Sequence, residues 1–131
     1  MLRIFGNRKE EEMPGLFRMT LHIKRGANQE MPSNMIGACV PVFVAGANHE
    51  TAARSAVSEI TRRGFEVVDI TDGRIDELDP KMWDEYVNQA WSEFAEYFPS
   101  QKEVRKKLSR GFLFVGPFAG YESSESKSGT D

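Results

Sequence analysis

The sequence predicts a single α+β domain, and three observations support this prediction. Residues 17–24 alternate between apolar and polar side chains, as a half-buried strand does. Residues 38–45 form a nearly unbroken apolar run, which is typical of a buried strand. Residues 49–63 and 80–98 place apolar side chains at helical spacing. The chain has 131 residues, 40% of them hydrophobic and 28% charged, which is the composition of one folded domain.

The two ends of the chain differ from its centre. Residues 1–15 contain a run of charges and no strand or helix period, so we expect a flexible N-terminal segment. Residues 122–131 are small and polar, which predicts a disordered tail. The single α+β domain is therefore expected over residues 16–121.

The first strand carries the clearest pattern. Its apolar positions are Phe17, Met19, Leu21 and Ile23, and its polar positions are Arg18, Thr20, His22 and Lys24. Successive side chains of a strand point to opposite faces of the sheet, so we expect the apolar set in the core and the polar row on an open face. Residues 26–37 hold turn-forming residues and follow as a loop.

The second strand leads into a helix. Pro41 has no backbone N–H, so we expect it at a bulge or an unpaired edge of the strand. Asn48 is a good N-cap for the helix over residues 49–63, and Gly64 is a good stop. Residues 65–70 have the pattern of a third strand, and the Thr71-Asp72-Gly73 turn is expected to fold a second, more polar strand, 74–78, back on it.

The remaining elements are a long helix, a short helix and a last strand. Asp79 and Pro80 are suited to the start of a helix that continues to Phe98. Ser100 and Glu103 form a capping box for a short helix, and residues 112–115 read as a strand. From Val40 onward the order is β-α-β-β-α-β, which predicts a ferredoxin-like βαββαβ sandwich with an additional N-terminal strand.

Charge and cysteine content exclude several classes of protein. The formal net charge of −3, from 17 basic and 20 acidic residues, makes nucleic-acid binding unlikely, although residues 102–110 are locally basic. Cys39 has no partner for an intrachain disulfide, and the chain has no N-glycosylation sequon, so we expect a reducing, cytoplasmic environment. No apolar run is long enough for a membrane helix, so no membrane association is expected.

The sequence offers little support for catalysis. His22, Cys39 and His49 do not have metal-ligand spacing, so we expect no metal and no cofactor. The G-x-S-x-G elbow, the phosphate-binding loop and the dinucleotide fingerprint are absent, and we assign no catalytic residue. Whether the chain is an enzyme stays open at this point.

Two surfaces are candidates for binding a partner. Arg18, His22 and Lys24 line up on the polar face of the first strand and are suited to an anionic partner; the alternative is an ordinary solvated strand face. Trp83 belongs to the aromatic stripe of the long helix and is a candidate partner anchor; the alternative is packing against the sheet.

A small-ligand site is predicted where the second strand meets the first helix. Asn48 and His49 lie at this turn, where free backbone N–H groups and the helix dipole favour an anion. The alternative is that they only make the turn and cap the helix. We therefore expect a non-enzymatic protein-binding or self-associating module, most simply a homodimer. The alternative is a small enzyme or ligand-binding domain with a pocket near His22 and His49.

Overall fold

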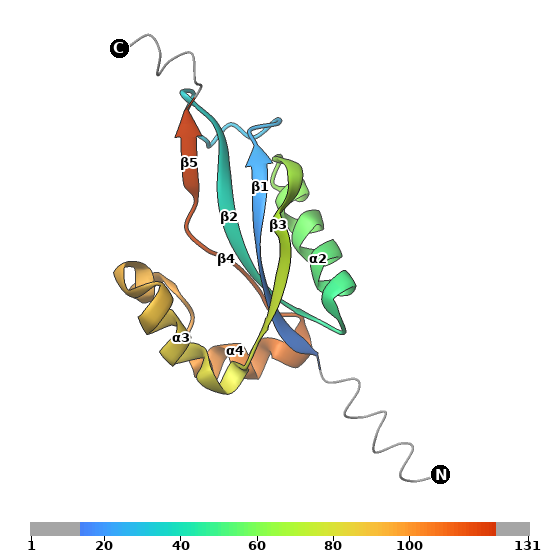
Figure 1. Ribbon diagram of the computed structural model, residues 1–131, viewed down its shortest axis with the longest axis vertical. Helices are drawn as coiled ribbons and strands as arrows, with labels where there is room; N and C mark the ends of the chain where they lie inside the picture. Colours follow the sequence, from blue (N-terminus) through green and yellow to red (C-terminus); the bar gives the residue numbers. More distant parts are fainter. Residues whose placement is uncertain (1–13, 123–131) are drawn as a thin grey trace.

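The computed structural model describes residues 14–122 (Figure 1). The predicted disordered tail lies outside these residues apart from Glu122, and so does the predicted flexible N-terminal segment up to residue 13. Gly15, the last residue of that segment, already belongs to the first strand.

The described chain is a mixed α and β structure built on one antiparallel sheet. The strands are β1 (Gly15–Lys24), β2 (Met35–Gly46), β3 (Glu66–Leu78), β4 (Leu113–Val115) and β5 (Ala119–Glu122). The α-helices are α2 (His49–Arg62), α3 (Trp83–Ala90) and α4 (Gln101–Lys107). Short 3₁₀ turns form η1 (Pro80–Met82), η2 (Ser92–Tyr97) and η3 (Leu108–Arg110).

The sheet has the order β3-β1-β2-β4. β5 also pairs with β2, along a different part of that strand from the part that pairs with β4. Both β2 and β3 are antiparallel to β1, so they run in the same direction, and α2 is the crossover that joins them. The ferredoxin-like connectivity is not confirmed. The strand that we expected as an addition in front of that fold lies inside the sheet, between β3 and β2.

The two faces of the sheet are covered differently. The odd positions of β1 from Phe17 to Ile23 are buried with α2 on one face, as their alternation predicts. The opposite face packs at one end on α3, η2 and α4 through a second apolar cluster centred on Phe43 and Trp83. At its other end, beside β5, no helix of the described residues lies over this second face (Figure 1).

The structure corrects the predicted hairpin within residues 65–78. Both halves of this segment pair with β1, so they form the single strand β3 and do not fold back on each other. Asp72 and Gly73 have positive φ values of 61° and 60° and form an irregularity opposite the Met19–Leu21 stretch of β1. Asp72 and Gly73 therefore form a bulge within β3 and not a hairpin turn.

The structure also corrects the long helix over residues 80–98. Only Trp83–Ala90 is α-helical; Trp91 leaves helical geometry with φ −132° and ψ 37°, and η2 follows. The bend returns Trp91 and Phe98 to the same cluster, with ring centroids 5.6 Å apart.

Pro41 has no backbone N–H, and it lies at a position of β2 that does not need this hydrogen-bond donor. β4 pairs with Val42–Val44 and β5 with Met35–Cys39, so the neighbouring strand is interrupted beside Pro41. Gly116 N, between β4 and β5, donates to Pro41 O at 2.8 Å. The N and O of a strand residue point to the same side, so the proline nitrogen faces this gap, as expected for an unpaired position.

Candidate functional site

The polar row of β1 is already matched by carboxylates of its own chain. In the β1–β3 register, Arg18 lies opposite Asp76, His22 opposite Asp69 and Lys24 opposite Glu66. Opposite charges on directly paired strand positions attract each other. The row that we expected to bind an anionic partner therefore has an acidic strand beside it.

Arg18 is held by two elements of the fold. Its guanidinium forms an ion pair with Asp76, and its Nη1 donates to Tyr86 Oη in α3 at 3.4 Å. Arg74 also donates to Asp76, and the two arginines, Arg74 first, hold the pKa of the Asp76 carboxyl below its usual value. Arg18 serves the packing of α3 on the sheet.

His22 and Lys24 lie on the part of the second face that no helix of residues 14–122 covers. His22 Nε2 is 2.6 Å from Tyr121 Oη in β5, and its Nδ1 is 3.9 Å from Asp69 Oδ1. In the tautomer that carries its proton on Nδ1, Nε2 accepts a hydrogen bond from the Tyr121 hydroxyl. Lys24 is exposed. The contact between His22 and Tyr121 therefore links β1 to β5.

Trp83 is not available to a partner in this structure. Its side chain is 1% exposed, and its Nε1 donates to Pro99 O at 2.8 Å. The ring packs edge-on against Phe43, with centroids 5.3 Å apart. Trp83 therefore packs against the sheet, which is the alternative that the sequence left open.

Asn48 and His49 line the same depression, whereas His22 does not. Asn48 Oδ1 accepts from Thr51 N at 2.8 Å and caps α2, and the His49 ring lies 4.8 Å from that of Phe17. Both line an open depression of about 430 Å³ at the Phe17 end of the sheet. His22 lies toward the other end of β1 and on its other face, so it does not line this depression.

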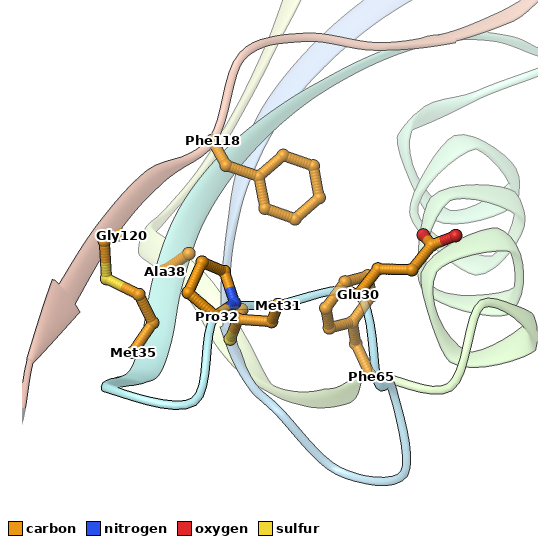
Figure 2. A pocket seen from close by; sticks show the side chains of 8 residues that line it. All are labelled: Glu30, Met31, Pro32, Met35, Ala38, Phe65, Phe118 and Gly120. Carbon is orange, nitrogen blue, oxygen red and sulfur yellow. The ribbon is translucent and has the colours of Figure 1, made fainter.

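A second, more apolar pocket is the best-formed candidate site. It has a volume of about 290 Å³ and lies on the α2 face of the sheet, between β2, β5, the loop after β1 and the residue that precedes β3 (Figure 2). The lining consists of Glu30, Met31, Pro32, Met35, Ala38, Phe65, Phe118 and Gly120. Glu30 is the one charged residue among them, and Figure 2 shows its carboxylate turned away from Met35 and Gly120.

The loop wall of this pocket is held by hydrogen bonds from the side chains of Asn28 and Arg25. Asn28 donates from Nδ2 to Arg63 O at 2.7 Å, and its Oδ1 accepts from Glu30 N at 2.8 Å and Met31 N at 3.0 Å. Arg25 donates to the carbonyl oxygens of Met31, Pro32 and Met35. The pocket is therefore pre-formed by its own chain, as ligand and partner sites commonly are.

Exposed apolar side chains surround the same end of the sheet. Ile36 is 44% exposed, Phe118 43% and Tyr121 37%. Phe118 forms one wall of the pocket, whereas Tyr121 lies on the opposite face of the sheet, where its hydroxyl meets His22, and Ile36 is not part of the lining. An exposed apolar side chain at the wall of a pocket is typical of surfaces that bind another molecule.

The lining of this pocket is suited to apolar contacts. No group of His, Cys, Asp or Glu that could hold a metal ion occurs within residues 14–122. The pocket lining brings no acid–base pair or nucleophile together, because Glu30 is its one titratable residue. Sequence reasoning missed the site: its lining comes from four separate stretches that have no common spacing.

The basic cluster lies away from this pocket. Residues 102–110 form α4 and η3, at the end of the molecule opposite β5 (Figure 1). Glu103 lies 3.6 Å from Lys107 in this segment, and Asp84 of α3 accepts from Gln101 N at 2.9 Å beside it. Carboxylates therefore lie among the cations. No helix in the described part of the chain is long and apolar enough to cross a membrane.

Comparisons add no family. No protein-family model, curated protein or solved structure matches the chain.

Proposed function

We propose that this chain is a non-enzymatic protein-binding module whose docking surface is the 290 Å³ pocket together with the exposed ring of Phe118 in its wall. The observation that carries the proposal is the presence of this exposed aromatic ring in the wall of a pre-formed apolar pocket. Binding energy at protein interfaces concentrates in apolar anchors that fill such pockets. Met31 and Met35 in the lining suit an anchor because their flexible thioether side chains adapt to its shape.

The test uses short random peptides selected for binding to the full chain. Affinity is then measured for the wild-type chain and for Phe118→Ser, which removes one wall of the pocket. Burying an apolar side chain contributes roughly 1.5–3 kcal/mol, so we expect the loss of this wall to weaken binding about tenfold.

Val68→Ser is the matched control. Val68 is 45% exposed, close to the 43% of Phe118, but it lies on β3 at the opposite side of the sheet. We expect this variant to bind within about twofold of wild type, because surface substitutions away from a site have small effects. Equal binding by all three proteins, or no selectable peptide, would reject the proposed function.

Self-association, most simply as a homodimer, is the second candidate, because another copy of the chain could cover the same docking surface. Light scattering of the purified chain over a range of concentrations tests it. A concentration-dependent dimer that Phe118→Ser dissociates would favour this candidate over a heterologous partner. The expectation of a cytoplasmic location belongs to both candidates and stays a prediction.

A further inference from the structure

The two edges of the sheet differ in how they are built. Within residues 14–122, β3 pairs only with β1 and β5 only with β2, so each has one side without a neighbouring strand. An unpaired strand edge is a template for another strand unless charges, bulges or prolines protect it. The protection of these two edges can be compared directly.

The β3 edge is protected. It exposes Glu66, Asp69, Asp72 and Arg74, and the left-handed residues Asp72 and Gly73 interrupt its regular geometry. Charges and bulges of this kind discourage pairing with a further strand.

The β5 edge lacks these features along most of its length. Ala119, Gly120 and Tyr121 carry no charge, none has a left-handed backbone, and Pro117 lies before the strand begins. This edge is also the one that borders the apolar pocket, through Phe118 and Gly120.

Along one row of paired residues across the sheet, the side chains become smaller toward this edge. Ile23 pairs with Ala38, and Ala38 pairs with Gly120, so the three share the α2 face of the sheet. The next position in the row, about 4.8 Å beyond Gly120, belongs to a strand that the described chain does not supply. A Cβ added at Gly120 would lie 2.9 Å from Met35 Sδ, so the thioether of Met35 covers Gly120 on this face. A large side chain at the next position would reach Ala38 and the pocket by displacing this flexible thioether.

The other face shows the same arrangement made within the chain. Tyr121 lies opposite Gly37 in the β2–β5 register, and a Cβ added at Gly37 would overlap the Tyr121 hydroxyl. The aromatic ring of one strand thus covers the glycine of its neighbour, which stabilises strand pairs that contain glycine. An aromatic side chain opposite Gly120 would repeat this packing at the outer edge.

From these observations we infer that the partner is an extended peptide segment that adds to the outer edge of β5 and places a large apolar side chain, preferably aromatic, over Gly120 and into the pocket. This inference rests on the proposed function and specifies its partner. β5 has four residues and offers few backbone hydrogen bonds, so the apolar anchor supplies most of the affinity.

The test takes a peptide selected on the full chain and methylates its backbone nitrogens one at a time. Strand addition predicts that methylation at every second residue weakens binding about two- to tenfold, the worth of one hydrogen bond, while the intervening positions tolerate it. Hydrogen exchange on the same complex is expected to show new protection at alternate amides of β5.

The outcomes separate this inference from the proposed function. A peptide that loses affinity on Phe118→Ser but shows no alternation in the methylation series would overturn strand addition and leave the pocket as the binding site. A peptide indifferent to Phe118→Ser would overturn both. A dimer of the free chain that competes with the peptide would assign the β5 edge to a second copy and overturn the peptide assignment.

Discussion

Asn28 is the residue whose removal tests most directly how the pocket wall is held. Its side chain makes three hydrogen bonds, to Arg63 O, Glu30 N and Met31 N, and so joins the loop after β1 to the end of α2. Asn28→Ala removes all three bonds and leaves their partners without a replacement at a buried position. At about 1 kcal/mol for each bond, we expect the free energy of unfolding to fall by about 3 kcal/mol.

Urea unfolding gives the measurement, provided that the dependence on denaturant is unchanged between variants. Asn28→Asp keeps the two acceptor interactions and loses the donor to Arg63 O, so its loss of stability is expected to fall between wild type and Asn28→Ala. Asn48→Ala is the matched control. Asn48 is an exposed helix cap, and its loss is expected to cost about 1 kcal/mol.

Hydrogen exchange provides a second readout. The amides of Glu30 and Met31 lose their acceptor in Asn28→Ala and should exchange faster, whereas amides in the middle of α2 should change only with global stability. An Asn28→Ala variant no less stable than Asn48→Ala, or unchanged exchange at those two amides, would refute the view that Asn28 fixes the loop.

Three further predictions concern single side chains elsewhere. Asp76→Asn should flatten the acid dependence of stability, because Arg74 and Arg18 lower the pKa of the Asp76 carboxyl from 3.8. The stability that the ionised carboxylate contributes is present above about pH 4 and is lost as the pH falls through the lower folded pKa. Urea midpoints measured from neutral to acidic pH will detect the difference between this variant and wild type. Trp83→Phe should cost about 2 kcal/mol in urea unfolding, because it leaves Pro99 O without its donor and part of the indole volume empty. Tyr121→Phe should cost less than about 1 kcal/mol, because the hydroxyl that meets the histidine is partly exposed; a larger loss in thermal unfolding would show that this contact holds β5 in place.

The elements that the sequence predicted correctly are those whose pattern has one structural solution. Alternation over Phe17–Ile23 fits a strand and no helix, and those positions are buried together. Asn48 and Ser100 cap helices because a side-chain acceptor before an amphipathic segment meets free backbone N–H groups.

The wrong predictions come from patterns with two solutions. Asp72-Gly73 can take positive φ in a hairpin turn or in a bulge, and only the pairing of both flanks with β1 decides between them. The aromatic spacing from Trp91 to Phe98 fits an α-helix, but over one or two turns a period of 3.6 cannot be distinguished from the 3.0 of a 3₁₀ turn.

The candidate site depends on strand register, which local patterns do not contain. The basic row of β1 was visible in the sequence, but its acidic partners on β3 lie 42 to 58 positions away and become neighbours only through the β1–β3 pairing. The same holds for Ala38 and Gly120, which are adjacent only because β5 returns to β2.

Register also changes which surface is free to bind. Carboxylates held beside a cation by the fold have a high effective concentration, so an external anion must displace them or bind weakly. Arg18 with Asp76 is such a pair, whereas the apolar pocket beside Gly120 has no side chain of the described chain filling it. The proposed recognition is therefore expected at the β5 edge and not at the charged half of the sheet, because a partner at the β5 edge adds contacts without first breaking any ion pair.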